Sequence, residues 1–206
     1  MRKAWDPALI QKILVISLTN IGDVILTTPV ISLLRDEFPA SFLSVLVGPK
    51  AEPIFTNSRT VNEVIPFDKH ASWSQMVSLV VRLRERKFDL VVDLRNTAIP
   101  LFIGPRYRSS FFVDRSFVSM RERHLNRLRP KLAVRNSPNR FHFFTVEEQA
   151  HAFEKLSQFL PISAGERYVV IAPGAGSELK RWTTSGFAAV AHHLMDLPTE
   201  TEHRII

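Results

Sequence analysis

The chain has 206 residues, of which 45% are hydrophobic, and it contains no cysteine. This length allows one domain or two small ones, and the lack of cysteine excludes disulfides, thiolate metal sites and cysteine nucleophiles. No apolar run approaches the roughly 20 residues that span a bilayer, and the N-terminus lacks the apolar core of a secretion signal. We therefore expect a cytoplasmic protein without a transmembrane segment.

The net charge of +7 is concentrated in one region. Between Arg106 and Arg140 there are ten lysines and arginines against two acidic residues. Such a segment predicts an anionic partner, namely a phosphorylated glycolipid, a membrane surface or a nucleic acid. Interleaved phenylalanines suit both lipid headgroups and nucleic-acid bases. No nucleic-acid-binding motif accompanies them, so we favour a lipid acceptor and expect no nucleic acid.

The first half of the chain alternates between strand and helix patterns. Its strands are unbroken apolar runs rich in β-branched residues, typical of a parallel sheet buried on both faces. A cap followed by proline at Thr28-Pro29 predicts that the first helix kinks or restarts there. The predicted strands cover residues 13–18, 42–47, 61–66 and 88–94, and the predicted helices cover 23–38 and 73–86. This alternation predicts a parallel sheet with right-handed crossovers.

A polar turn follows the first predicted strand and contains Thr19, Asn20, Gly22 and Asp23. Ligands of open α/β sheets bind beyond the carboxyl ends of the strands, against helix N-termini. Asp23 is therefore expected at the mouth of a site, although an aspartate at a helix start is by default only a cap. The turn has one glycine where the dinucleotide fingerprint has three.

The second half becomes regular only near its end. Residues 100–140 are interpreted as mostly basic and loop-like, residues 144–160 as a helix and 161–166 as a linker. A strand over 168–172, a glycine loop over 173–182 and a helix over 184–197 then repeat the opening unit, and 204–206 begin another strand. One such unit cannot cover its own apolar face. We therefore expect a complete domain over 1–160, and over 161–206 a linker with the incomplete start of a second domain.

These segments together resemble the lipopolysaccharide heptosyltransferase family, glycosyltransferase family 9. The resemblance rests on Lys12–Pro29, Leu46–Lys50 and Phe88–Leu94 in the first half, and on Pro173–Ser177 and Lys180–Trp182 in the second. It implies the GT-B fold, in which two Rossmann-like domains face each other and bind acceptor and nucleotide-sugar respectively. It also implies inverting transfer of heptose from ADP-heptose to the lipopolysaccharide core, at the cytoplasmic face of the inner membrane and with peripheral membrane contact.

The resemblance assigns roles to individual residues. Asp23 matches the family's catalytic aspartate, the base for the acceptor hydroxyl, and Lys180 matches a lysine that contacts the donor diphosphate. The remaining donor-binding candidates are Gly174, Ala175, Gly176 and Ser177, whose N–H groups suit an anion. The acceptor-binding candidates rest on position instead: Thr19, Asn20 and Gly22 lie in the turn beside Asp23, and Arg95, Arg106 and Arg108 lie near a predicted strand end, where the alternatives are pairing with acceptor phosphates or carboxylates and plain surface solvation. We expect no metal and no cofactor besides the nucleotide-sugar substrate.

The family's later donor-site motif would lie beyond residue 206, so the chain alone is expected to be inactive. The rival hypothesis is a truncated, non-catalytic module that binds an anionic glycolipid or a protein, and a third is a basic nucleic-acid-binding protein. Three residues near the candidate site are given structural rather than catalytic roles. Asp89 and Asp93 are expected to serve the strand, and Trp182 to pack beside a helix start.

Overall fold

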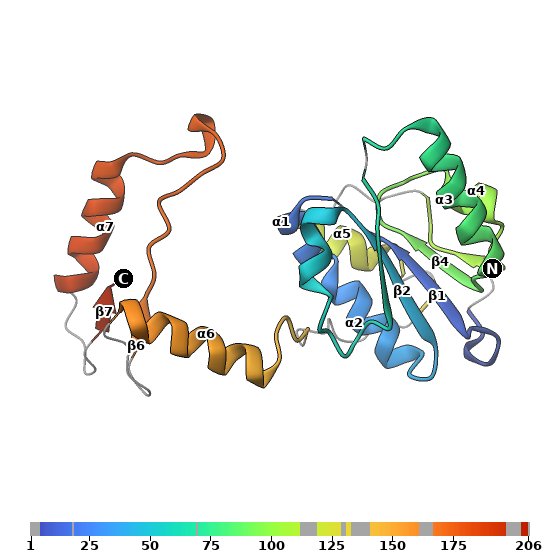
Figure 1. The fold of residues 1–206 in the computed structure, drawn as a ribbon, viewed down its shortest axis with the longest axis horizontal. Helices are drawn as coiled ribbons and strands as arrows, with labels where there is room; N and C mark the ends of the chain where they lie inside the picture. Colours follow the sequence, from blue (N-terminus) through green and yellow to red (C-terminus); the bar gives the residue numbers. More distant parts are fainter. Residues whose placement is uncertain are drawn as a thin grey trace. The chain divides into compact units, whose positions relative to one another are not determined.

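The computed structural model describes residues 5–17, 19–68, 70–111, 119–128, 131–132, 141–160, 167–196 and 203–205. They form two compact units, Met1–Thr145 and Val146–Ile206, which are described separately (Figure 1). The division falls before the helix α6 (Val146–Phe159). The boundary predicted after residue 160 placed this helix in the first domain instead.

The first unit is built on a parallel sheet of five strands in the order β3-β2-β1-β4-β5. Every pairing in it is parallel, and β1 at the centre aligns Val15 with Val45 of β2 and with Val92 of β4. The strands are β1 (Lys12–Ile16), β2 (Phe42–Val47), β3 (Glu63–Pro66), β4 (Leu90–Asp93) and β5 (Tyr107–Arg108). Parallel strands end on one edge of the sheet, and the loops after β1 and β4 therefore meet there.

Both faces of the sheet are covered, as the continuous apolar strands predict. Ile13 and Val15 of β1 pack into one cluster, and Leu14 and Ile16 pack into another on the opposite face. The first cluster lies under α2 (Thr28–Glu37) and α5 (Met120–Asn126), and the second under α3 (Trp73–Glu85) and α4 (Ile99–Ile103). The alternation follows from the period of two along a strand.

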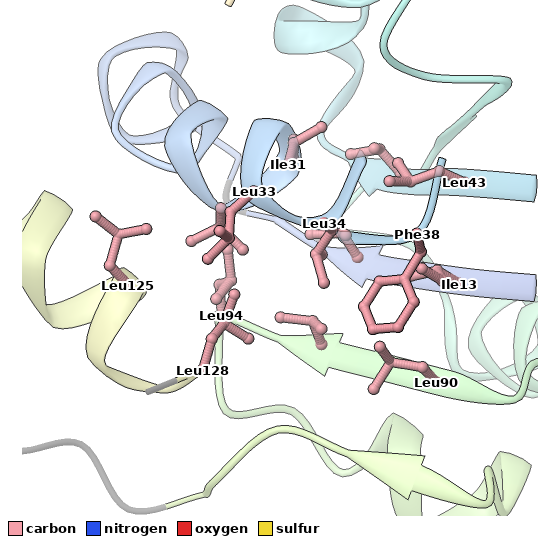
Figure 2. Packing of buried hydrophobic residues seen from close by; sticks show 14 of the residues in the cluster. Ile13, Ile31, Leu33, Leu34, Phe38, Leu43, Leu90, Leu94, Leu125 and Leu128 are labelled. Carbon is pink, nitrogen blue, oxygen red and sulfur yellow. The ribbon is translucent and has the colours of Figure 1, made fainter. Parts of the chain in front are cut away.

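The helix α5 is fixed to this sheet by apolar side chains on and just after it. Leu125 and Leu128 are fully buried and pack with Leu33 of α2 and Leu94 at the end of β4 (Figure 2). Burying a leucine side chain contributes about 2 kcal/mol. Two such residues hold α5 at the carboxyl edge of the sheet, where it contributes to the site.

The chain between β1 and α2 bends where the sequence predicted a restart. A short helix α1 (Ile21–Ile25) ends, and α2 begins at Thr28 with Pro29 at its second position. The buried Thr27 hydroxyl donates to the Val24 carbonyl at 2.7 Å and contacts the Ser17 hydroxyl at 2.8 Å. The bend is therefore tied to the end of β1.

The remaining connections use short helical turns and one capping box. These turns are η1 (Pro7–Leu9) and η2 (Pro49–Ile54). At the start of α3, the Ser72 hydroxyl accepts from the Gln75 N–H, and the Gln75 side chain accepts from the Ser72 N–H. This reciprocal pair satisfies two otherwise free donors at the helix end.

The second unit contains α6, β6 (Arg167–Val169), η3 (Glu178–Lys180), α7 (Thr184–Asp196) and β7 (His203–Ile205). The strands β6 and β7 pair in parallel, so the repeated strand–loop–helix unit and the strand predicted after it are confirmed. The linker predicted over 161–166 lies outside the described residues. No helix in the described part of the chain combines the length and apolar character needed to cross a bilayer.

The basic segment is where sequence and structure differ most. The sequence predicts a mostly loop-like segment over 100–140, but residues 99–103 form α4, residues 107–108 form the short strand β5 and residues 120–126 form α5. The prediction failed because arginine and glutamate dominate α5 and hide its short apolar stripe. Within the described residues that stripe begins at Leu125 on α5 and continues past the helix to Leu128 and Leu132, all of which are buried.

Candidate active site

The turn after β1 brings four predicted site residues together. Asn20 stands in extended conformation before α1, and its side-chain amide donates to the Asp23 carboxylate at 3.1 Å. Asp23 is half-buried and lies in the first turn of α1, while Asn20 and Gly22 are exposed. The carboxylate is thus held at the carboxyl edge of the sheet but keeps access to solvent.

Thr19 is held by a close approach between two loops. A Cβ added to Gly48, just after β2, would lie 2.9 Å from the Cα of Thr19 and 3.0 Å from its carbonyl oxygen. Real Cβ atoms do not approach backbone this closely, so only glycine fits without a shift. Gly48 therefore fixes the distance between the β1 and β2 loops.

We expect Gly48→Ala to lower the free energy of unfolding by about 1–3 kcal/mol, because the added methyl group forces one loop away from the other. Thermal or urea unfolding of the purified chain measures this. Gly22→Ala is the matched control, since a Cβ there meets nothing within 4 Å. In helix α1 that change should be neutral or stabilising by up to about 1 kcal/mol. Equal stability of the Gly48→Ala variant and the wild type would contradict the steric argument.

The loop after β4 is organised by the buried carboxylate of Asp93. One of its oxygens accepts from the Arg95 N–H at 2.9 Å, and the other accepts from the Thr97 N–H at 2.6 Å and the Thr97 hydroxyl at 2.9 Å. Asn96 between them adopts a left-handed conformation with φ of 58°. Such a turn favours asparagine over bulkier residues. The structural role expected for Asp93 is therefore confirmed.

Asp89 likewise serves the strands rather than the site. Its carboxylate accepts from the N–H groups of Gln11 and Lys12 at 2.9 Å each, at the start of β1. Both groups lie at the opposite end of β1 from the loop that holds Asp23. The prediction that Asp89 stays out of the site is therefore confirmed.

The helix α5 adds two residues that the sequence analysis did not assign. Arg127, just after it, is buried and donates from Nη1 to the Asp93 carbonyl at 2.7 Å and to the Asn96 side chain at 2.6 Å. Burial lowers the pKa of Arg127 and the Asp93 carboxylate opposes this, but a guanidinium stays protonated. Arg127 thus locks α5 to the loop after β4.

His124 lies within α5 and is 2% exposed. Its pKa is lowered to about 4, mostly by burial and also by the Arg127 guanidinium, while the Asp23 carboxylate raises it. The imidazole is therefore neutral at pH 7. Neither ring nitrogen has a hydrogen-bond partner among the residues that the structure describes.

A basic pocket of about 610 Å³ opens beside this loop. The cationic side chains that line it are those of Arg106, Arg108, Arg127 and Lys131, and Asp93 adds one carboxylate. Arg106 also stacks over the Tyr107 ring, 5.5 Å from its centroid. Two of the predicted acceptor residues, Arg106 and Arg108, are thus brought together. The cluster suits a phosphate or carboxylate group.

A second pocket of about 660 Å³ lies between α3 and α4. Its walls are mainly apolar, with Trp73, Val77 and Phe102 among them, and Arg95 stands at its polar end. Asn96 and Thr97 line both pockets. Arg95, predicted to bind acceptor with Arg106 and Arg108, therefore lines the apolar pocket instead of the basic one, and Asp23 lines neither.

The predicted donor residues lie in the second unit. The loop over 173–177 is largely exposed, and the N–H of Lys180 donates to the Ser177 carbonyl at 3.1 Å, closing the turn η3. Added Cβ atoms at Gly174 and Gly176 meet nothing within 4 Å. These glycines are therefore not required for packing within their own unit, and Lys180 is exposed at the end of the loop.

Trp182 packs against the start of α7. Its ring meets Phe187 edge-on at 5.2 Å, and a Cβ on Gly186 would lie 2.6 Å from it. The packing role expected for Trp182 is therefore confirmed.

No family model matches the chain. Individual proteins of known sequence or structure are nevertheless similar to it. The chain is 27% identical over 195 residues to lipopolysaccharide heptosyltransferase 3 of Escherichia coli, and the match covers 82% of this chain. A solved family 9 glycosyltransferase from Veillonella parvula covers 95% of it with a TM-score of 0.73 and 21% identity. This chain is thus similar in sequence to a lipopolysaccharide heptosyltransferase and similar in fold to a family 9 glycosyltransferase.

The relationship extends over both units but not over the whole length of the relatives. The E. coli ADP-heptose lipopolysaccharide heptosyltransferase II superposes with a TM-score of 0.66 and 22% identity, and covers 95% of this chain and 64% of its own. The chain spans 56% of heptosyltransferase 3 and 68% of the Veillonella enzyme. The predicted fold class is confirmed: the chain has the α/β architecture of GT-B heptosyltransferase structures over the part that it spans.

Proposed function

We propose that the protein containing this chain is an inverting glycosyltransferase that moves heptose, or a related sugar, from a nucleotide-sugar to the lipopolysaccharide core. The observation that carries the proposal is the carboxylate of Asp23, held at the carboxyl edge of a parallel sheet whose neighbouring loop opens into a basic pocket. Kinship with heptosyltransferase 3 supports the class of reaction. The fold likeness to the E. coli ADP-heptose lipopolysaccharide heptosyltransferase II supports ADP-heptose as the donor.

The proposed reaction requires removal of one proton from the acceptor and departure of one diphosphate from the donor. Asp23 takes the proton of an acceptor hydroxyl, the hydroxyl oxygen bonds to the anomeric carbon of the sugar, and the bond from that carbon to the diphosphate breaks with inversion. Lys180 and the N–H groups of residues 174–177 stabilise the departing diphosphate. No metal and no further cofactor takes part in the proposed reaction.

The two pockets of the first unit suit an amphiphilic acceptor. The basic pocket offers guanidinium groups to phosphate or carboxylate, and the apolar pocket begins at Asn96 and Thr97, which line both. A glycolipid carries anionic sugars and hydrocarbon on one molecule, and therefore matches both walls. Exposed apolar side chains of α3 and α4, such as Trp73 and Phe102, favour peripheral contact with the inner membrane at its cytoplasmic face.

The test is a transfer assay of the protein containing this chain, with ADP-heptose and heptose-deficient lipopolysaccharide, in which mass spectrometry detects the added sugar. The proposal expects one heptose added with inverted anomeric configuration. Acceptor binding without transfer would favour a non-catalytic glycolipid-binding module. Tight binding of oligonucleotides without lipopolysaccharide binding would favour the nucleic-acid hypothesis. Either result would overturn the proposed reaction.

We expect Arg106→Gln and Arg108→Gln each to raise the acceptor KM about tenfold, because each removes one charge-assisted hydrogen bond to an anionic group. The donor KM should not change, since both residues lie in the first unit. Steady-state kinetics with varied acceptor measures the effect. Arg84→Gln on the exposed side of α3 removes the same charge away from the pocket and is the control. An equal rise in the control would show a general charge effect and contradict the pocket.

A further inference from the structure

The guanidinium group of Arg127 is only partly used by the fold. Arg127 is 6% exposed, and its side chain lines the basic pocket. Its Nη1 group makes the hydrogen bonds to the Asp93 carbonyl and the Asn96 side chain. Nε is buried and has no partner in the described part of the chain, and buried donors in native proteins call for an explanation. Because an arginine carries five N–H donors, more of them remain than these two bonds use.

A second buried donor lies in the wall of the same pocket. Ser109 follows β5 and is 8% exposed. Its hydroxyl accepts the Asp93 N–H at 3.0 Å, and a hydroxyl that accepts one hydrogen bond still has its own hydrogen to donate. Ser109 and Arg127 both line the basic pocket. The pocket therefore has two polar side chains fixed by burial, in addition to the exposed guanidinium groups of Arg106 and Arg108.

The charge of the pocket wall favours a doubly charged anion. Four cationic side chains and one carboxylate, Asp93, give the described part of the wall a net charge of +3. That carboxylate is already the acceptor of three hydrogen bonds from its own loop. A single carboxylate ligand would leave two positive charges unbalanced, whereas a phosphate monoester carries nearly two negative charges at neutral pH. Its three oxygens also suit donors that come from β5 on one side and from the end of α5 on the other.

We propose that the basic pocket is a site for a phosphate monoester in its doubly charged form, and that Arg127 is the residue that determines this specificity. Arg127 and Ser109 donate to the phosphate from the buried wall, and Arg106 and Arg108 donate from the exposed rim. This proposal deepens the proposed function and rests on it, because the phosphate belongs to the acceptor. Arg127 also holds Asn96, which lines the apolar pocket as well. One side chain thus connects the bound phosphate to the loop between the two pockets.

The first experiment follows the Nε–H resonance of Arg127 by NMR in the protein containing this chain, while methyl phosphate, sulfate or acetate is added. At pH 7.5 methyl phosphate should shift this resonance and bind about tenfold more tightly than acetate, which carries one charge. The second pKa of a phosphate monoester is about 6, so only about a tenth of it is doubly charged at pH 5. Its affinity should therefore fall about tenfold at pH 5. Sulfate stays doubly charged over this range, and its affinity should not change.

The charges of the pocket itself change little between these two pH values. Arginine and lysine side chains titrate far above this range. His124 on α5 is already neutral, because burial lowers its pKa to about 4. Any change in the charge of Asp93 would alter the binding of sulfate as well as that of methyl phosphate. Equal affinity for methyl phosphate at both pH values would overturn the proposal, as would acetate binding as tightly as methyl phosphate.

Two variants test the residues of the site in the same titration. Arg127→Lys keeps the positive charge but loses the planar set of donors, and should weaken methyl phosphate binding about tenfold. Because Arg127 also supports the loop after β4, Arg108→Gln on the exposed rim is the second variant, and it should weaken binding about tenfold with the fold intact. Arg84→Gln on α3 is the control outside the pocket. Unchanged affinity in both pocket variants would overturn the site.

The transfer assay separates this proposal from the proposed function. Removing the phosphate monoesters from the lipopolysaccharide acceptor should raise the acceptor KM about tenfold. An unchanged KM would overturn the phosphate site while keeping the transfer reaction. Methyl phosphate bound as expected by a protein that transfers no sugar would instead overturn the proposed reaction and keep the site.

Discussion

Asp23→Asn is expected to lower the rate of sugar transfer about a thousandfold, with the fold intact. Asparagine has the same shape, but its amide cannot take up the acceptor proton, and removal of a general base costs about 10²–10⁴ in rate. The hydrogen bond from Asn20 can be kept, since the asparagine side-chain oxygen replaces the carboxylate oxygen that accepts it. The loss should therefore appear in kcat, with both KM values near those of the wild type.

Stability separates the catalytic role from a structural one. Asp23 lies in the first turn of α1, where a negative charge contributes about 0.3–1 kcal/mol. The free energy of unfolding of Asp23→Asn should therefore differ from that of the wild type by no more than about 1 kcal/mol. Asp36→Asn on the exposed part of α2 makes the same change in charge and should leave transfer unaltered. Near-normal turnover by Asp23→Asn would show that Asp23 is not the base, and would contradict the proposed mechanism.

The elements that sequence predicts best are those whose pattern is local. The β1 run is apolar because both faces of the strand are covered, and this burial is visible as unbroken hydrophobicity from Ile13 onward. The break between α1 and α2 was predicted because Thr28-Pro29 combines a cap with a residue of fixed φ. The placement of Asp23 follows from both, since it is the first carboxylate after the first strand.

The missed parts depend on contacts between distant segments. Arginine side chains are usually exposed, so the sequence alone places Arg127 on the surface. Its hydrogen bonds to Asp93 and Asn96, more than thirty positions earlier, make it part of the site. His124 was given no role in the sequence analysis, because its burial depends on the packing of α5 against α2 and leaves no local signal. The spacing of Leu125, Leu128 and Leu132 was the one signal in the sequence for that helix. This leucine pattern is too short to predict a helix in a segment rich in arginine.

The division of the acceptor residues has a similar cause. Arg95, Arg106 and Arg108 were grouped because they lie near a predicted strand end. Position along the chain does not show which pocket each side chain lines. The left-handed turn at Asn96 separates Arg95, which lines the apolar pocket, from the arginines of the basic pocket.

The buried carboxylate that makes this turn leads to the second large effect, on stability. Asp93→Ala is expected to lower the free energy of unfolding by about 3–5 kcal/mol. It leaves the N–H groups of Arg95 and Thr97 and the Thr97 hydroxyl without their acceptor in a partly buried loop. Bonds to a charged group are worth about 1.5–3 kcal/mol each, and their losses overlap because one side chain makes all three.

Asp93→Asn is the matched variant, because one amide oxygen remains to accept a bond while the other position becomes a donor. The new side-chain NH₂ group points a donor at backbone N–H groups that need an acceptor. We therefore expect the free energy of unfolding to fall by an intermediate amount, about 1–3 kcal/mol. Urea unfolding of both variants at pH 7 gives the two values. Because Asn96 and Thr97 line both pockets, the loss should be accompanied by weaker acceptor binding, whereas a purely local defect would leave it unchanged. Equal stability of Asp93→Ala and the wild type would show that water satisfies the loop, and that its shape does not depend on this carboxylate.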